Sequence, residues 1–311
     1  MSTLILRNQE NEDVLYLQEK SSSNHILWEL EGRCNFVCKY CYDSRVRNGV
    51  LKEETLEKWI QFLKDSEYEY IHISGGEPTL HPQLEYIVHH LQNKKICLST
   101  NLSGHLALLS DFIKENRIYS IAISLDSLDA SINDELRSHT QVVIHNIESL
   151  LKVKKANHSK VKIRIHSVLT KKNLHTMSEL FRWAIAIGID EVSAQPVSIQ
   201  KEHPCYAELA LTKEDLKQVK NILKEENELF HSQYASSHSS LLDYYYDHKN
   251  CYILNENEQC DNFIDATGVL WNCPRRIYKL DENNINENKT IVCKINNQCM
   301  TCLKRRFVEE E

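Results

Sequence analysis

The sequence has few of the residues that mark fibrous or unstructured chains, with seven glycines and five prolines among 311 residues. Such low counts exclude collagen-like, linker-rich and low-complexity architectures. No apolar run approaches the roughly 20 residues that a membrane-spanning helix needs. The start of the chain also lacks the long apolar core of a signal peptide. We therefore expect a cytoplasmic, globular protein with no membrane partner.

Positive charge is also in short supply. The chain has 37 Lys and Arg residues against 44 Asp and Glu residues, which gives a net charge of −7. Because such a surface repels phosphate groups on average, nucleic acid is not an expected partner. Hydrophobic residues make up 41% of the chain, which is enough to build a sizeable core. The composition therefore indicates a large folded domain.

Cysteine, by contrast, is abundant, with 11 residues. Three lie at 34–41 and six lie from 251 onward, while only Cys97 and Cys205 lie between the two groups. In a reducing compartment, closely spaced thiols act as metal ligands rather than as disulfide partners. The sequence therefore predicts metal binding near both ends of the chain.

Short apolar segments rich in β-branched residues alternate with longer segments of helical period. The predicted strands are 25–30, 70–74, 95–100, 120–125, 161–169 and 191–197, and the predicted helices are 53–66, 84–92, 106–114, 142–153 and 175–188. Six strands that alternate with helices predict parallel βαβ units with right-handed crossovers. Such units form either a partial barrel or an open doubly wound sheet. In both, the chemistry gathers at the carboxyl ends of the strands.

The two ends of the chain depart from this alternation. Residues 4–17 predict a small β-hairpin placed before the main domain. A helix is expected at 211–235, with a capping signal at Thr212, and the pattern breaks at 236–250. A second hairpin is predicted at 263–272 in the tail. We therefore divide the chain into an N-terminal extension at 1–24, an α/β domain at 25–235 and a Cys-rich domain at 236–311.

The first cysteine group lies just past the first strand of the α/β domain, as Cys34-x3-Cys38-x2-Cys41. Three thiolates can hold three irons of a [4Fe–4S] cube, and no adjacent cysteine supplies a ligand for the fourth. An open iron corner is typical of a catalytic cluster. The alternative is a zinc site, which would need a distant fourth ligand such as His72 or His81.

This spacing, with Tyr40 just before the last cysteine, resembles the motif of the radical S-adenosylmethionine (SAM) superfamily. The resemblance covers residues 25–200 and implies a partial (β/α)6 TIM-like barrel. It implies that the open iron chelates the methionine moiety of SAM and that the reduced cluster passes one electron to the sulfonium. The resulting 5′-deoxyadenosyl radical would take a hydrogen atom from the substrate. Tyr40 is also a candidate for stacking on adenine.

Two further segments at strand ends resemble SAM-binding segments of that superfamily. Gly75, Gly76 and Glu77 match its GGEP segment, which implies contact with the methionine amino group. Ser99 and Asn101 match its segment near the ribose, although Leu102 replaces the usual glycine. The simpler alternatives are a Gly-Gly turn for the first segment and an Asx turn for the second.

The remaining candidates follow the later strands. Ser124 resembles the superfamily residue that contacts the methionine moiety, while Asp126 either joins it or orders its own loop. Arg137 and Arg164 are candidates for the methionine carboxylate, because a guanidinium binds carboxylate through two parallel hydrogen bonds. A surface ion pair is the alternative for Arg137. We expect Arg164 to face the barrel interior.

The tail cysteines resemble the SPASM/Twitch extension of radical SAM enzymes. The resemblance implies an auxiliary [4Fe–4S] cluster in a small Cys-rich subdomain, and zinc in the same cage is the alternative. The predicted ligands are Cys260, Cys273, Cys299 and Cys302, with Cys251 as a substitute for one of them.

The resemblance implies a SAM-cleaving oxidoreductase or maturase that receives electrons from a donor such as flavodoxin or ferredoxin. Members with this extension mostly crosslink, epimerise or oxidise ribosomally made peptides and proteins, and we expect the same here. A dehydrogenase or epimerase of a small molecule such as an aminosugar or aminocyclitol is the alternative. A non-enzymatic zinc or electron-transfer protein is the competing class. Cys205, in the loop after the sixth strand, is either a hydrogen-atom donor or an ordinary half-buried cysteine.

Overall fold

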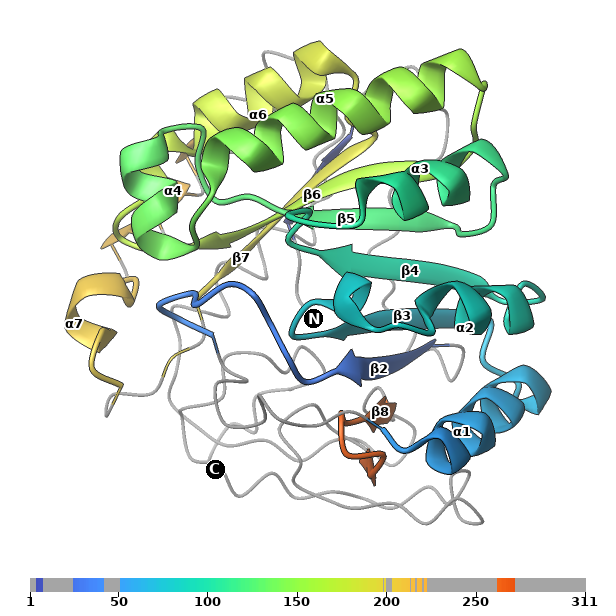
Figure 1. Cartoon of the computed structure of the whole chain (residues 1–311). Coiled ribbons are helices and arrows are strands. Elements are labelled where there is room, and N and C mark those ends of the chain that lie inside the picture. Colours follow the sequence, from blue (N-terminus) through green and yellow to red (C-terminus); the bar gives the residue numbers. More distant parts are fainter. Residues whose placement is uncertain are drawn as a thin grey trace, which may run out of the picture.

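A nine-stranded sheet forms the centre of the computed structural model (Figure 1). The structure describes residues 4–7, 25–41, 51–197, 199, 203–212, 214–215, 217–219, 221–222 and 262–271. The strand order is β1-β7-β6-β5-β4-β3-β2-β8-β9. The strands are β1 (Leu4–Arg7), β2 (His25–Glu31), β3 (Tyr70–Gly75), β4 (Lys95–Thr100), β5 (Ser120–Ser124), β6 (Lys162–Leu169), β7 (Glu191–Pro196), β8 (Asn262–Ile264) and β9 (Leu270–Trp271).

All neighbouring pairs from β2 to β7 are parallel, and β8 is also parallel to β2. The six predicted strands are therefore confirmed, in the predicted order. The helices are α1 (Glu53–Asp65), α2 (Leu84–His90), α3 (Leu106–Lys114), α4 (Ala130–Leu136), α5 (Thr140–Ala156), α6 (Met177–Ile187) and α7 (Tyr206–Leu209), with short 3₁₀ turns at Pro78–Leu80 and Leu174–Thr176. None of the helices in the described residues is long and apolar enough to cross a membrane.

The two faces of the sheet differ in polarity. One face carries fully buried aliphatic residues such as Ile71, Ile121 and Ile163, which pack under the helices. The opposite face is lined by polar residues, including His72 on β3 and Arg164 on β6. A doubly wound sheet buries apolar residues on both faces. The one-sided core and the helices along the outside therefore identify the partial-barrel alternative (Figure 1).

The described ends of the chain join this sheet rather than standing apart from it. Among the described strands, β1 lies at the edge of the sheet and pairs antiparallel with β7, with Leu4 opposite Ala194. The first strand of the hairpin predicted at 4–17 is thus present as β1, and the rest of that hairpin lies outside the described residues. The second predicted hairpin is confirmed as β8 and β9, which pair antiparallel around a turn at Gly268.

The β8–β9 hairpin is fixed to the barrel from two sides. β8 lies beside β2, with Asn262 level with Ile26. The indole nitrogen of Trp59 on α1 donates a hydrogen bond of 3.2 Å to the carbonyl oxygen of Gly268. A Cβ at position 268 would lie 2.8 Å from the side chain of Thr55, and the residue has φ +78°. Glycine is therefore the residue that fits this turn.

Helix α4 is the main element that the sequence did not predict. Asp129 caps it by accepting a hydrogen bond from the backbone nitrogen of Ser131. Apart from alanine its only apolar residues are Ile132 and Leu136, which are too few for a clear periodic pattern. The predicted cap at Thr212 is confirmed, because Thr212 and Asp215 exchange hydrogen bonds of 2.7 and 3.2 Å.

Candidate active site

The loop after β2 carries Cys34, Cys38 and Cys41 at the end of the sheet where the parallel strands finish. All three are half-buried, and the described cysteines form no disulfide. The backbone nitrogen of Cys41 donates to the carbonyl oxygen of Cys38 at 3.2 Å, and that of Lys39 donates to Leu136 at the end of α4 at 3.0 Å. The three thiols thus lie on one short loop that is anchored to α4.

The thiol of Cys38 lies in an apolar setting. Burial raises its pKa to about 11, which Arg137 opposes, while Asp126, Cys41 and Cys34 add to the increase. A metal reverses this tendency, because it binds the thiolate and keeps it deprotonated.

Gly75 and Gly76 allow the end of β3 to lie against the start of the cysteine loop. A Cβ at Gly75, which has φ +124°, would lie 2.3 Å from the carbonyl oxygen of Glu31. A Cβ at Gly76 would lie 2.2 Å from the carbonyl oxygen of Arg33. The close approach that glycine permits here is to the protein's own backbone, just before Cys34. The glycines therefore set the position of the cysteine loop.

Glu77 is fully buried and surrounded by donors from its own chain. Its Oε1 accepts from the backbone nitrogen and hydroxyl of Thr79, at 3.1 and 2.6 Å, and from the hydroxyl of Thr100 at 2.7 Å. Its Oε2 accepts from the backbone nitrogen of Asn101 at 2.7 Å. Burial raises the pKa of Glu77, and these hydrogen bonds oppose the increase. In this structure Glu77 joins the ends of β3 and β4.

Asn101 links the end of β4 to the first cysteine. Its side-chain nitrogen donates to Asn35 at 2.9 Å and lies 3.9 Å from the sulfur of Cys34. Its side-chain oxygen accepts from the backbone nitrogen of Ser103 at 2.9 Å, which is the predicted Asx turn. Leu102, at the position where the superfamily has glycine, adopts φ +56°. The turn therefore has the left-handed conformation that glycine favours, even with a leucine in place.

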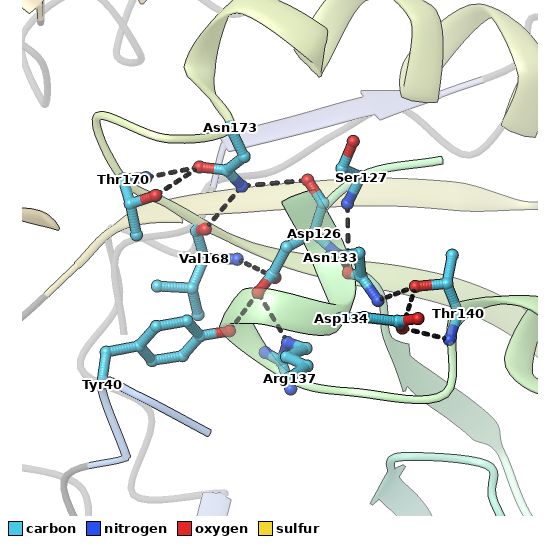
Figure 2. Close-up of polar contacts among 10 residues, drawn as sticks. All are labelled: Tyr40, Asp126, Ser127, Asn133, Asp134, Arg137, Thr140, Val168, Thr170 and Asn173. Atoms are coloured by element: carbon cyan, nitrogen blue, oxygen red, sulfur yellow. Dashed lines mark hydrogen bonds and ion pairs between the residues drawn. The ribbon is translucent and has the colours of Figure 1, made fainter. Parts of the chain in front are cut away.

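Asp126 connects the cysteine loop to α4 and β6, as Figure 2 shows. Its Oδ2 accepts hydrogen bonds from the hydroxyl of Tyr40 and, at 2.7 Å, from Nε of Arg137. Its Oδ1 accepts from the backbone nitrogen of Val168 at 2.8 Å. Of the two alternatives for Asp126, the structure supports the one in which it orders its loop.

Arg137 and Tyr40 are therefore partners of one buried carboxylate. The side chain of Arg137 is 9% exposed and that of Asp126 is not exposed, so their ion pair is buried rather than superficial. The guanidinium carbon lies 5.3 Å from the centre of the Tyr40 ring. Burial raises the pKa of Tyr40 well above its ordinary value. The Tyr40 ring thus packs on Arg137, and its hydroxyl is held by Asp126.

Two asparagines that the sequence analysis missed support this group (Figure 2). Asn133 accepts from the backbone nitrogen of Asp126 at 2.9 Å and donates to the hydroxyl of Thr140 at 2.8 Å. Asn173 donates to the carbonyl oxygens of Asp126 and Val168, both at 2.9 Å. No local pattern marks either residue. Their burial, at 1% and 0% exposed, is the only signal, and it is visible only in three dimensions.

Ser99, Ser124 and Arg164 lie on the polar interior face. On neighbouring strands, Ser124 is level with His166. Ser99 and Arg164 flank Ala122 at one level, two residues before Ser124. Arg164 therefore faces the interior as predicted, but two residues before the position level with Ser124. It forms an ion pair with Glu191 on β7. Arg164 thus lies five residues before the end of β6 at Leu169.

The two isolated cysteines differ in their surroundings. Cys97 is buried within β4, and burial raises the pKa of its thiol. Cys205 is half-buried and packs against a small apolar cluster that includes Tyr40 and Val168, which Cys38 also contacts. Cys205 therefore lies on the same side of the molecule as the cysteine loop. The predicted tail ligands lie outside the described residues: Cys251, Cys260, Cys273, Cys299 and Cys302.

The family described as the Radical SAM superfamily matches this chain over residues 29–184. That segment is half of the chain and contains all three cysteines of the β2 loop. The chain belongs to the radical SAM superfamily. Members of this superfamily are enzymes, and the family implies a [4Fe–4S] cluster and SAM as cofactors.

Two relatives of this radical SAM protein illustrate the range of named activities. A probable GTP 3′,8-cyclase from Sulfurisphaera tokodaii is 28% identical over 200 residues, covering 62% of this chain and 61% of the relative. An S-adenosylmethionine-dependent nucleotide dehydratase, RSAD2, from Siniperca chuatsi is 28% identical over 171 residues, covering 53% of this chain and 48% of the relative. The match therefore spans about half to three fifths of these relatives.

Solved structures with the same fold include peptide-binding proteins. Streptococcus suis SuiB bound to S-adenosylmethionine superposes with a TM-score of 0.66 at 17% identity, covering 86% of this chain and 65% of SuiB. The structure of anSMEcpe with AdoMet and the Kp18Cys peptide gives a TM-score of 0.63 at 18% identity, covering 85% of this chain and 78% of that chain. At such identities the likeness establishes the fold alone, the radical SAM partial barrel.

The β2 loop of this radical SAM protein fits an iron–sulfur cube better than a zinc ion. Zinc needs ligands that converge on one atom, whereas a cube binds each thiolate at a different iron. Among the described residues, no three His, Cys, Asp or Glu side chains converge on a single-ion site. Of the candidate fourth zinc ligands, His72 lies 3.1 Å from His25, and His81 accepts from the backbone of Gln83 through Nδ1, while its buried Nε2 has no partner among the described residues. Cys34, Cys38 and Cys41 are the residues that would hold the cube.

Proposed function

We propose that this protein cleaves SAM reductively and uses the resulting radical to take a hydrogen atom from a substrate. The observation that carries the proposal is the cysteine loop. Three half-buried thiols lie at the strand ends, held by the Gly75–Gly76 turn on one side and by Leu136 on the other. The bound cluster supplies the electron for the cleavage, and the protein contributes position and exclusion of water.

The residues around the loop offer a binding site for the methionine part of SAM. Among the described residues, no acceptor binds the two terminal nitrogens of Arg137, so its guanidinium can take a carboxylate. Ser124 and Ser99 line the interior face beside it. Glu77, Gly75 and Gly76 act in this proposal by shaping the turn. Asn101 acts by contacting the cysteine loop, and Tyr40 by attaching that loop to Asp126. Arg164, which pairs with Glu191, belongs to a deeper part of the interior.

We infer that the substrate is a peptide or protein, modified by crosslinking, epimerisation or oxidation. The support comes from proteins of the same fold, since SuiB is bound to the precursor peptide SuiA and anSMEcpe to the Kp18Cys peptide. The location of Cys205 beside the apolar cluster of Tyr40 and Val168 favours the hydrogen-atom donor role, because a thiol there lies near the cysteine loop. That role belongs to an epimerisation.

A small-molecule substrate is the second candidate, favoured by the names of the closer sequence relatives. The GTP 3′,8-cyclase and the nucleotide dehydratase act on nucleotides. The net charge of −7 argues against an anionic nucleotide as the preferred ligand and suits a neutral or cationic molecule such as an aminosugar.

The tail completes the proposal. We assign an auxiliary [4Fe–4S] cluster to a domain at 236–311, following the extension at 1–24 and the barrel at 25–235. An anaerobically reconstituted protein should then carry about eight irons, two cubes, in place of about four. A cytoplasmic flavodoxin or ferredoxin is the proposed electron donor. Iron and sulfide analysis of wild type and of a variant with Cys260 and Cys273 replaced by alanine would test the assignment.

The proposed activity is tested without knowledge of the substrate. Reduced, cluster-loaded protein is mixed with SAM, and 5′-deoxyadenosine is measured by mass spectrometry. The Cys38→Ala variant should lose the nucleoside and bind fewer irons, because its cube lacks a ligand. Cys97→Ala is the matched control, since Cys97 is a buried strand residue. A colourless protein that holds zinc at the β2 loop would refute the proposal.

A further inference from the structure

The carboxylate of Asp126 receives hydrogen bonds from three separate parts of the chain. Tyr40 belongs to the cysteine loop, Arg137 ends α4, and Val168 lies near the end of β6 (Figure 2). Asp126 is 1% exposed, so water cannot replace any of these partners. A carboxylate without such donors would not be stable at this depth. The three contacts therefore fix one another.

The contact with Arg137 leaves one edge of its guanidinium available. Asp126 binds Nε, at 2.7 Å, and no described residue accepts from the two terminal nitrogens. A guanidinium is planar, so holding Nε sets the direction in which the terminal pair points. That pair has the geometry for two parallel hydrogen bonds to a second carboxylate. Asp126 thus fixes the orientation of the Arg137 guanidinium.

The same oxygen of Asp126 also holds Tyr40. Tyr40 is the residue before Cys41, and its ring packs against the guanidinium of Arg137. Any shift of Asp126 would move both the arginine and the turn that contains Cys38 and Cys41. We propose that Asp126 is a positioning residue that aims Arg137 at the carboxylate of SAM and holds the cluster-binding turn in register with it. This inference rests on the proposed function.

Binding of SAM can be compared with binding of decarboxylated SAM, which lacks only the anionic group. Wild-type protein should prefer SAM. In Asp126→Asn an amide nitrogen can face the Nε–H of Arg137, so the guanidinium loses its fixed direction and the preference for SAM should fall about tenfold. A residue with a merely structural role would weaken both ligands equally. Dissociation constants are measured on the cluster-loaded protein.

A double variant tests whether Asp126 acts through Arg137. Arg137→Lys keeps the charge and loses the planar group. Adding Asp126→Asn to Arg137→Lys should change the preference for SAM by less than about twofold, because the residue it positions is already absent. Asp134→Asn is the control, since Asp134 lies on α4 and bonds Thr140 rather than Arg137. It should keep the wild-type preference.

Several results would overturn the inference. It is wrong if Asp126→Asn keeps the wild-type preference, if the losses in the double variant are additive, or if Asp134→Asn loses as much. Should Asp126→Asn fail to fold, Asp126→Glu retains the charge and displaces the guanidinium, and it must also lower the preference. If wild-type protein with a full cluster binds no SAM, the proposed function fails instead.

Discussion

The backbone nitrogen of Glu77 donates a hydrogen bond of 2.9 Å to the carbonyl oxygen of Arg33, the residue before Cys34. This bond, with that from Gly76 to Glu31 at 2.6 Å, attaches the end of β3 to the start of the cysteine loop. The Gly-Gly-Glu segment is thus part of the scaffold for the thiols. Changes at these positions should therefore affect metal binding before they affect chemistry.

Replacing Gly76 with alanine should lower the iron content of the reconstituted protein. Its Cβ would lie 2.2 Å from the carbonyl oxygen of Arg33 and 3.0 Å from Cβ of Cys34, so the loop must move. Gly104→Ala is the matched control, because a Cβ there meets nothing within 4 Å. We expect at least a twofold loss of iron in the first variant alone, measured by iron and sulfide assay. Equal iron contents would contradict this role of Gly76.

At position 102 a glycine variant should be more stable than an alanine variant, which is the reverse of the usual order of stability. Its φ of +56° costs an L-residue about 1 kcal/mol, while glycine adopts this conformation freely. Leu102→Ala and Leu102→Gly both lose the fully buried side chain, and only the second relieves the backbone. The free energy of unfolding, from urea denaturation, should therefore be about 1 kcal/mol higher for the glycine variant. At Leu98, within β4, the glycine variant should be the less stable one, and the same order at both positions would refute the argument.

Replacing the buried carboxylate of Glu77, even by a group of the same shape, should destabilise the protein. Glu77→Gln keeps the shape but places an amide nitrogen among donors from Thr79, Thr100 and Asn101. We expect the free energy of unfolding to fall by about 2 kcal/mol, since a buried group is left without its partner. The exposed Glu148 provides the control. A Glu77→Gln variant as stable as Glu148→Gln would show that these bonds contribute little.

His166 should make the protein less stable in mild acid. Burial lowers its pKa to about 3, and Arg137 and Arg164 act in the same direction. In the unfolded chain a histidine takes up a proton below about pH 6.5, so the unfolded state binds more protons than the folded state between about pH 6.5 and pH 3. The free energy of unfolding therefore decreases as the pH is lowered across that window. From pH 7.5 to 5.5 the loss from this residue should be about 1 kcal/mol.

The variant His166→Gln isolates that contribution, because glutamine does not titrate. Urea unfolding at the two pH values should show a smaller loss of stability in the variant than in the wild type. His81, whose pKa burial also lowers, remains in both proteins and cancels from the comparison. Equal losses would mean that the imidazole of His166 is protonated in the folded state.

The sequence predicted those features that depend on residues close together in the chain. The alternation of strands and helices and the Cys34–Cys41 spacing are local patterns, and the structure has the strands where they were expected. The partners of Glu77, by contrast, include Thr100 and Asn101 on the next strand. These internal partners of Glu77 were not predicted, because periodicity does not reveal which donors meet a buried carboxylate.

The same reason explains why the strand pairings at the edges of the sheet were not predicted. β1 pairs with β7, whose residues lie almost 190 positions later, and β8 pairs with β2 across 236 positions. No local motif predicts either pairing. Asn173, which holds Asp126 from 47 positions away, is a further case. Local sequence patterns therefore could not predict the long-range strand pairing, whereas they did predict the cysteine motif.

The position of the β8–β9 hairpin bears on the auxiliary cluster that we propose for the tail. Its two ends, Asn262 and Trp271, lie level with Ile26 and Leu27, at the opposite end of β2 from Cys34. The stretch of β2 from Ile26 to Glu31 measures about 17 Å at the rise of a β-strand. A redox centre assembled where the hairpin begins and ends would be kept from the thiols by this rigid spacer. The separation would then be fixed by the sheet and not by the conformation of a loop.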